Sequence, residues 1–224
     1  MLHVSPDPPS TAQACAQQLA AWIAEAVATQ GIAHTALSGG STPKLMLEIL
    51  ATLGVDWSRA HFWQVDERGV PPDHPQSNAR MIRAALAPAV HFHRMRGEKD
   101  ARQAAGEYAA EIELHLGAAP FDVVQCGIGD DGHTASLFPG QPLVLDRSGL
   151  AAGLWVEDKQ QWRITLLPKP ILAARHLAVL AAGAGKAPAL RRALSGPIDL
   201  LSTPAQLLRT GHWFLDLAAQ QSAK

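Results

Sequence analysis

The segment GIGDDGH at residues 127–133 holds the residue types best suited to chemistry. It follows an apolar run that ends at Cys126, and it places two carboxylates and an imidazole among glycines. A neutral imidazole can act as a general base near pH 7, and Asp131 or Glu67 could hold the second ring nitrogen of His133. The same residues also suit a metal site, a phosphate-binding loop or a plain turn, so the segment alone does not decide between them.

Two further features favour a catalytic base over a metal site at His133. Thr134 and Ser136 are helix-capping residue types, and we therefore expect His133 to lie at a helix start. The positive end of the helix dipole would disfavour the imidazolium and keep the ring neutral. Asp130, Asp131 and His133 form no recognised set of metal ligands, so we expect no metal in this site.

Polar clusters also follow three other predicted strands. Ser38, Gly39, Gly40, Ser41 and Thr42 follow a strand over 33–37; Asp66, Glu67 and Arg68 end a strand over 61–66; Lys186 closes the GAGK turn after a strand over 176–182. In open α/β sheets, ligands bind beyond the carboxyl ends of the strands. We therefore expect the four clusters to converge on one site.

The 38–42 loop suits an anion, because its glycines and the start of the following helix can present backbone N–H groups to a phosphate. The loop lacks the GxxxxGK[ST] pattern, and the alternative is a tight turn with Thr42 as N-cap. Arg68 could bind a phosphate or a carbonyl oxygen, or form a solvated ion pair. Lys186 could attract an anion as a point charge, or it could be a solvated lysine near a helix start. Arg163, which lies between apolar residues, needs a carboxylate or a phosphate as partner.

Helical patterns alternate with short apolar strands, which predicts a parallel or mixed sheet covered on both faces. We expect helices over 11–30, 43–53, 77–87, 98–116 and 186–194, and strands over 33–37, 61–66, 121–127, 152–157, 162–166, 176–182 and 212–217. Ser10 and Gln13 fit a capping box for the first helix. Residues 1–9 form a lead-in and 218–224 a tail to a single domain spanning 1–224.

The 224-residue chain is 47% hydrophobic with a net charge of −1, so it can bury a large core, and no global field marks it as a nucleic-acid or membrane-surface protein. The two cysteines indicate reduced, packed thiols, and no Cys/His ladder indicates zinc. The N-terminus does not resemble a secretory signal, and no apolar run is long enough to cross a bilayer. We expect a cytoplasmic protein.

Several motifs together resemble those of the 6-phosphogluconolactonase family. They are SGGSTPKLML, VDERGVP with Ser77-Asn78, FDVVQCGIGDDGHTASLFPG, RITLLPKPILAARH, GAGKAPALRRAL and HWFLD, in order from about residue 36 to 217. The resemblance implies a three-layer α/β/α fold with a mostly parallel central sheet, similar to that of aminosugar-phosphate deaminases and ribose-5-phosphate isomerase. It implies hydrolysis of 6-phospho-D-glucono-1,5-lactone to 6-phosphogluconate, the second step of the oxidative pentose phosphate pathway, with no metal or other cofactor.

The resemblance also implies roles for individual residues. His133 would activate water, with Asp131 or Glu67 orienting it. The residues that would gather around the sugar phosphate are Ser38, Gly39, Gly40, Ser41, Thr42, Asp66, Arg68, Asn78, Gly129, Arg163 and Lys186. The partner would be this small lactone alone, and the protein a monomer or weak homo-oligomer. Two positions depart from the family: Ala79 replaces an aromatic residue, and Asp130 replaces a frequent proline.

Two other functions compete with the lactonase. The glucosamine-6-phosphate deaminases share similar loops, but their second motif ends in Asp-Glu-Tyr and their later motif continues with Asn-Glu-Pro, where this chain has DER and SLFPG. A non-catalytic sugar-phosphate sensor would carry an added helix-turn-helix domain and a basic face. The N-terminal residues are too few and too poor in Lys and Arg for that, and the intact His133 also favours the enzyme.

Overall fold

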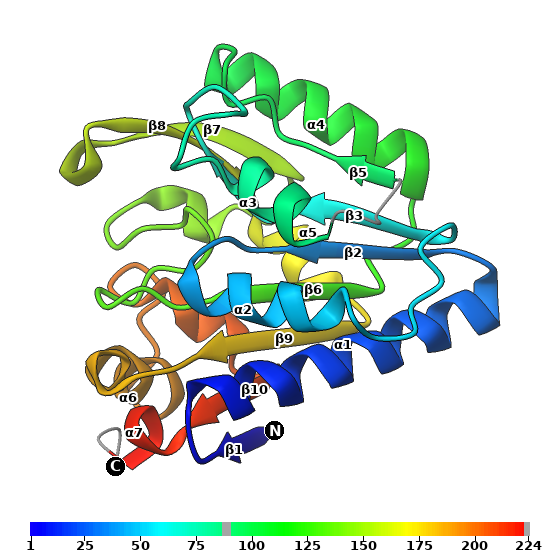
Figure 1. Ribbon diagram of the computed structural model, residues 1–224. Helices are drawn as coiled ribbons and strands as arrows, with labels where there is room; N and C mark the ends of the chain where they lie inside the picture. The colour runs from blue at the N-terminus through cyan, green and yellow to red at the C-terminus, as the bar shows by residue number, and fades with distance from the viewer. Residues whose placement is uncertain (87–90, 222–224) are drawn as a thin grey trace.

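The computed structural model describes residues 1–86 and 91–221 as a three-layer α/β/α structure (Figure 1). The strands are β1 (Leu2–Ser5), β2 (Ala33–Leu37), β3 (Ala60–Gln64), β4 (Asp66–Arg68), β5 (His91–His93), β6 (Val123–Gly127), β7 (Ala151–Val156), β8 (Gln161–Leu166), β9 (His176–Ala181) and β10 (His212–Asp216). The α-helices are α1 (Pro8–Gln30), α2 (Ser41–Leu50), α3 (Asn78–Ala85), α4 (Ala101–Leu116), α5 (Pro168–Ala173), α6 (Ala187–Leu194) and α7 (Leu217–Gln221).

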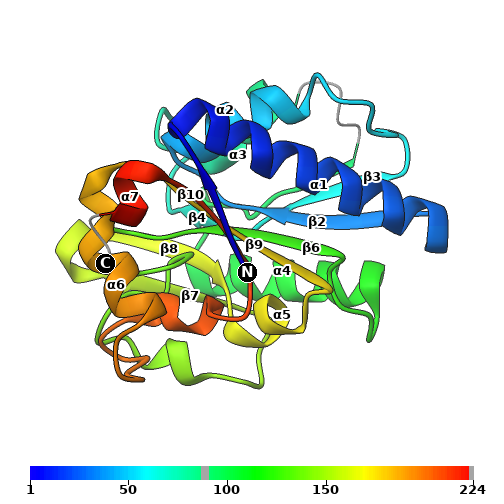
Figure 2. The same cartoon turned by 90° about the horizontal axis from the view of Figure 1, so that it is seen from below.

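The main sheet has seven parallel strands in the order β1-β10-β9-β6-β2-β3-β5. Figure 2 shows α1, α2 and α3 on one face of this sheet, and α4, α5 and α6 on the other. Its central strands are buried on both faces, which is why their sequences read as apolar runs without alternation. The expected three-layer fold with a mostly parallel sheet is confirmed.

A second sheet of three antiparallel strands, in the order β4-β8-β7, packs on the α4 side of the molecule. The predicted strand over 61–66 is confirmed for residues 61–64, which lie in β3, but it ends there, and Asp66 begins β4 in the second sheet. Val65 lies at the junction: its N–H donates to Leu37 in the main sheet, and its carbonyl accepts from Leu166 in the small one. This crossing carries the side chains of β4 away from β3 and toward β8.

The amino-terminal prediction is also corrected. The expected lead-in contains β1, which pairs in parallel with β10. Helix α1 begins at Pro8, and Asp7 caps it by accepting the N–H of Ser10 at 2.8 Å, so the capping box at Ser10 is wrong. At the other end, α7 occupies part of the expected tail, and residues 222–224 lie outside the described residues. Residue 87, the expected end of α3, also lies outside them.

The direction in which successive strands are added to the sheet changes between β2 and β6, although all strands run parallel. From β2 the chain proceeds outward through β3 to β5, and it then returns to β6 on the other side of β2 before adding β9 and β10. Such a switch point leaves a crevice beyond the carboxyl ends of the two central strands, where the connections part to opposite faces. The loops after β2 and β6 are those that hold the predicted 38–42 and 127–133 clusters.

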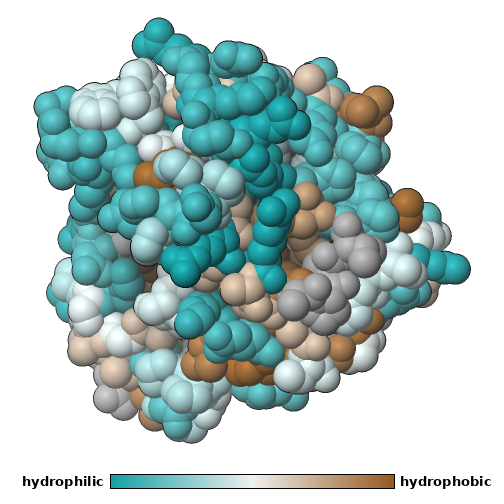
Figure 3. All heavy atoms as spheres, turned by 45° about the horizontal axis from the view of Figure 1, so that its top comes forward, coloured by the Kyte–Doolittle hydropathy of each residue, from teal (hydrophilic) through white to brown (hydrophobic). Residues whose placement is uncertain are grey.

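No helix of the described residues is long and apolar enough to span a membrane. On the face shown in Figure 3, hydrophilic side chains cover most of the surface, and hydrophobic residues occur in small groups.

Candidate active site

A cavity of about 320 Å³ opens beyond the carboxyl ends of β2 and β6. The residues that line it come from both sheets and from four loops: Ser38, Gly39, Gly40, Asp66, Arg68, Gly127, Ile128, Gly129, His133, Ala135, Phe138, Lys159, Arg163 and Lys186. All four clusters singled out in the sequence therefore contribute to one cavity. Of the predicted site residues, Ser41, Thr42, Glu67, Asn78 and Asp131 do not line it.

The loop between β2 and α2 forms one wall of the cavity. Gly40 adopts a φ of 118° as the N-cap of α2, without a side-chain cap, so Thr42 is not the N-cap that the alternative interpretation of this loop required. The first N–H groups of a helix have no intrahelical partner, and here they belong to a loop that lines the cavity. The neighbouring strand β6 positions Ser38, whose hydroxyl donates to the Gln125 side chain at 2.9 Å.

Gly39 is required by the packing of Asn78 beneath the loop. A Cβ at Gly39 would lie 1.8 Å from Asn78 Oδ1, too close for any other residue. The Asn78 amide in turn donates to the backbone carbonyl of Asp66 at 2.9 Å and to its carboxylate at 3.0 Å. Asn78 is thus a buried brace between the glycine loop and β4, and its neighbour Ala79 is buried away from the cavity.

His133 and Asp131 form a close pair at the cavity. Asp131 Oδ1 lies 2.6 Å from His133 Nδ1 and also accepts the backbone N–H of His133 at 3.0 Å. Burial alone would raise the pKa of Asp131, but these bonds and the His133 charge, with a smaller effect of Lys159, lower it to about 2. The carboxylate therefore stays ionised and fixes the Nδ1–H tautomer, which leaves Nε2 of His133 free to accept a proton.

The backbone around this pair is a tight turn, and the predicted helix start at His133 is wrong. A bridge between Thr134 and Leu137 encloses Ala135, which has a φ of 52°. Thr134 donates its hydroxyl to the Gly127 carbonyl at 2.9 Å, so it braces the turn and caps no helix. The imidazole therefore does not lie at a helix start, and Asp131 holds its Nδ1.

Gly129 allows the imidazole to come this close to the chain. A Cβ there would lie 2.1 Å from His133 Nδ1 and 2.6 Å from Asp131 Oδ1. On its other side, the His133 ring packs against Phe138, with ring centroids 4.5 Å apart.

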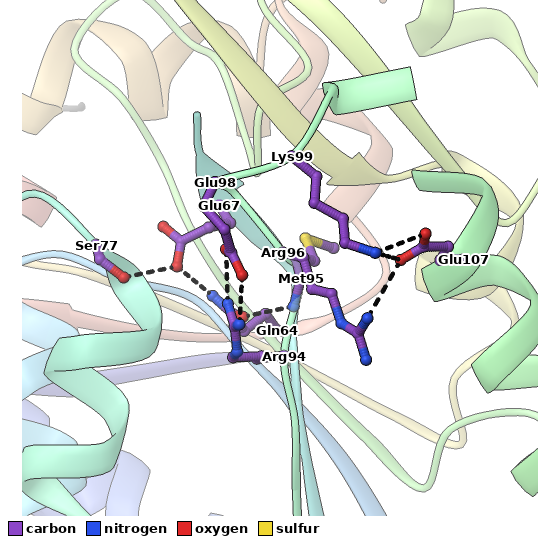
Figure 4. A network of polar contacts seen from close by, with 9 residues as sticks. All are labelled: Gln64, Glu67, Ser77, Arg94, Met95, Arg96, Glu98, Lys99 and Glu107. Carbon is purple, nitrogen blue, oxygen red and sulfur yellow. Dashed lines mark hydrogen bonds and ion pairs between the residues drawn. The ribbon is translucent and has the colours of Figure 1, made fainter. Parts of the chain in front are cut away.

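Glu67 lies outside the cavity and does not orient His133. Its buried carboxylate accepts hydrogen bonds from the Gln64 side chain and the Ser77 hydroxyl (Figure 4). It also accepts from the backbone N–H groups of Arg68, Asn78 and Ala79. It therefore joins β4 to the start of α3. Asp66 points the other way and does line the cavity, where its Oδ2 accepts the Ser136 hydroxyl at 2.7 Å.

Four cationic side chains surround the cavity. Arg68 of β4 and Arg163 of β8 are register partners, and the Nε of each is buried without a hydrogen-bond partner among the described residues. Burial lowers the pKa of Arg163, Arg68 lowers it further, and Asp66 opposes both. Two like charges on directly opposite residues repel each other, and an anion between them would remove that repulsion.

The other two cations come from loops. Lys186 ends the short 3-10 helix Ala184–Lys186, and its Nζ lies 2.7 Å from Asp130 Oδ1. Asp130 thus has a cationic partner at the edge of the cavity. Lys159 lies in the turn between β7 and β8, and the sequence analysis missed it. Its only signal in the sequence is a positive charge between the two strands predicted over 152–157 and 162–166.

The combination can perform acyl transfer to water. A neutral imidazole with a fixed tautomer can accept a proton from water, and the cations can hold an anionic substrate and stabilise a developing oxyanion. The candidate base, the glycine loops and the cations all border the same cavity.

Residues 6–215 match the profile of a family described as glucosamine-6-phosphate isomerases/6-phosphogluconolactonase. The chain is 35% identical over 199 residues to the 6-phosphogluconolactonase of Haemophilus influenzae, covering 83% of this chain and 85% of the relative. It is 34% identical to that of Streptomyces coelicolor over 97% of this chain and 92% of the relative. The chain belongs to the glucosamine-6-phosphate isomerase/6-phosphogluconolactonase family.

Solved structures of this family share the fold described above. The crystal structure of a 6-phosphogluconolactonase from Shewanella baltica superposes with a TM-score of 0.88 at 29% identity, over 96% of both chains. That of the Trypanosoma brucei 6-phosphogluconolactonase gives a TM-score of 0.88 at 27% identity, over 100% of this chain and 98% of the other. The similarity to these structures thus covers the whole three-layer fold.

Proposed function

We propose that the chain hydrolyses 6-phospho-D-glucono-1,5-lactone to 6-phospho-D-gluconate, the second step of the oxidative pentose phosphate pathway. The observation that carries the proposal is the His133–Asp131 pair at the mouth of a cavity with four cationic side chains. The names of the relatives within the family support lactonase chemistry over deamination. The DER and SLFPG segments point the same way.

In the proposed mechanism, His133 Nε2 takes a proton from a water molecule, whose oxygen forms a bond to the lactone carbonyl carbon. Asp131 stabilises the resulting imidazolium. The carbonyl oxygen becomes an oxyanion, which Arg68 or backbone N–H groups stabilise. The tetrahedral intermediate then breaks its bond to the ring oxygen, and His133 returns its proton to that oxygen as the ring opens.

The phosphate group would be held at the other side of the cavity. The backbone N–H groups of Gly39 and Gly40, together with Arg163 or Lys186, offer it neutral and charged donors. Ser41 and Thr42 do not line the cavity, so their contribution would be the dipole of α2, whose first residues they form. Lys159 adds a charge on the hairpin side. The mechanism needs no metal and no other cofactor.

We also infer that residues 1–224 work as a single domain in the cytoplasm, as a monomer or weak homo-oligomer, with the small lactone as the only partner. The net charge of −1 supports the absence of a nucleic-acid or membrane-surface partner. Size-exclusion chromatography with light scattering tests the oligomeric state, and a stable large assembly would contradict it.

The deciding experiment is a lactonase assay on freshly made 6-phosphogluconolactone, corrected for spontaneous hydrolysis. The wild-type chain should accelerate hydrolysis, and His133→Ala should lower kcat at least about 100-fold while its circular dichroism spectrum shows an intact fold. His115→Ala, an exposed histidine of α4 remote from the cavity, is the matched control and should keep kcat. Ammonia release from glucosamine 6-phosphate, or binding of 6-phosphogluconate without turnover, would overturn the proposal.

A further inference from the structure

Three histidines from three elements meet at the β5 edge of the main sheet, remote from the cavity. His61 belongs to β3, His93 to β5 and His115 to the last turn of α4. One ring nitrogen from each lies within 4.8 Å of the other two. His61 is near the amino-terminal end of β3, whereas the active-site cavity lies beyond the carboxyl ends of the strands. The group therefore shares no residue with the proposed lactonase site.

The spacing of the nitrogens suits a metal ion. His61 Nδ1 and His93 Nε2 are 3.0 Å apart. Two imidazole nitrogens that bind one tetrahedral Zn²⁺ at about 2.0–2.1 Å lie about 3.3 Å from each other. These two rings thus need to separate by only a few tenths of an ångström. His115 is exposed and one of its ring nitrogens lies within 4.8 Å of both, so its side chain is the one that must move to complete the third bond.

The orientation of His93 is set by a carboxylate behind it. Glu111 Oε1 lies 2.7 Å from His93 Nδ1, on the side of the ring opposite to Nε2. A carboxylate that accepts from one ring nitrogen directs the lone pair of the other outward, which is the arrangement found behind histidine ligands of metal ions. Glu111 precedes His115 by one turn of α4. The same helix therefore supplies the ligand His115 and the carboxylate that orients His93.

Aromatic stacking holds the two strand histidines in place. His61 and Trp63 are two residues apart in β3, so their side chains lie on the same face of the sheet. The same holds for His91 and His93 in β5. His93 stacks on Trp63 with ring centroids 3.9 Å apart, and His61 stacks on His91 at 4.3 Å. The rings are therefore ordered before any ion binds, which lowers the entropy cost of binding.

We propose that His61, His93 and His115 bind one divalent d-block cation, of the class of Zn²⁺ or Co²⁺, with water at the fourth position. Imidazole is the ligand type that these ions favour over Mg²⁺ or Ca²⁺. The bound ion would tie the three-residue strand β5 to both β3 and α4, so its effect is on the stability of the sheet edge. The site lies outside the proposed lactone chemistry, which uses no metal. Its ligands are far apart in the sequence, so no ligand spacing reveals it.

The test uses the full chain without a polyhistidine tag. Titration calorimetry with ZnCl₂ should give one equivalent bound, and CoCl₂ should give the visible absorption of tetrahedral Co²⁺. Zn²⁺ should raise the melting temperature, since an ion that binds only the folded state stabilises it. His115→Ala should weaken binding at least about tenfold and abolish the rise in melting temperature, with the metal-free melting temperature unchanged. Glu111→Gln should also weaken binding, but by a smaller factor than His115→Ala.

Two matched variants separate this site from other histidines. His133→Ala removes the active-site imidazole, and His212→Ala removes one partner of the His3–His212 pair, whose ring nitrogens are 3.1 Å apart. Both variants should bind Zn²⁺ as tightly as the wild type. The proposal is overturned if the wild type binds less than one equivalent, if His115→Ala binds as tightly as the wild type, or if His133→Ala or His212→Ala abolishes binding. Because His115 is exposed, its substitution keeps the test valid even if His61→Ala or His93→Ala fails to fold.

Discussion

Arg68 and Arg163 occupy directly opposite positions of the antiparallel pair β4–β8, and the Nε atom of each is buried without a hydrogen-bond partner among the described residues. Burial lowers the pKa of Arg163, so the arrangement costs stability in the free protein. An anionic substrate in the cavity that both side chains line would offset the repulsion between the two guanidinium groups. The repulsion between the two arginines therefore lowers the stability of the free protein and favours the binding of an anion.

From this relationship we expect Arg163→Met to have opposite effects on stability and binding. Removing one of two repelling, desolvated charges should raise the melting temperature by a few degrees, an effect on the order of 1 kcal/mol. The same change should raise KM for the lactone about tenfold or more, because a charge-assisted donor to the substrate is lost. Thermal unfolding and steady-state kinetics measure the two effects. A lower melting temperature together with an unchanged KM would contradict this account.

Gly129→Ala should disable the base without disturbing substrate binding. The added methyl group would overlap both His133 Nδ1 and Asp131 Oδ1, so the imidazole must leave its position. We expect kcat to fall about 100-fold, while KM changes little. Gly106→Ala is the control: this exposed glycine of α4 has open space around it, and alanine there should add about 0.5–1 kcal/mol of stability and leave kcat unchanged.

The Asp131–His133 pair gives a pH dependence of stability with a defined sign. The pKa of Asp131 is about 2 in the folded protein against an ordinary value of 3.8, so the folded state binds the proton more weakly than the unfolded state. The resulting stabilisation is fully present above the ordinary value and is lost as the pH falls toward 2. Urea unfolding of the wild type and Asp131→Asn, from about pH 6 downward, should show a constant difference that shrinks below about pH 4. A difference that grows toward low pH would contradict the sign.

Asp130→Asn tests whether the ion pair with Lys186 competes with the substrate. In the free protein the Lys186 ammonium is 2.7 Å from the Asp130 carboxylate, which is largely exposed. Neutralising this carboxylate should free the ammonium for the phosphate group and lower KM severalfold, with a small effect on melting temperature, since exposed ion pairs contribute little to stability. In the Lys186→Met background, Asp130→Asn should have no further effect on KM, and the full double-mutant cycle measures this coupling.

The sequence indicated where the site lies better than how its parts are arranged. The alternation of apolar strands with helical segments predicts a parallel sheet. In such a sheet the carboxyl ends of the strands lie together, so the glycine, hydroxyl and charged residues at those ends are expected to meet. The roles of Glu67 and Asn78 could not be read in this way. Both follow β3 at the expected place, yet their polar groups turn inward to join α3 and the glycine loop, which depends on long-range packing.

Errors in the predicted elements have the same origin. The helix expected at His133 rested on capping residue types, but Thr134 and Ser136 bond to Gly127 and Asp66 instead, so tertiary acceptors replaced the local ones. Lys159 was missed because a charged residue in a hairpin turn is ordinary, and only the pairing of β7 with β8 brings that turn over the cavity. Local patterns define strands and helices well, but they carry no information on which turn faces which cavity.

The pairing of β1 with β10 has a consequence for how the protein folds during its synthesis. Strand β1 is synthesised long before β10, so it finds its partner only after the intervening chain, including all the other strands, has been made. Helix α1 packs mainly against α2 and the strands beside it, so part of its apolar face can be covered earlier, but the edge of the sheet cannot close. We therefore expect nascent chains that stop short of β10 to expose apolar surface and to depend on chaperones, since contacts of such long range form late.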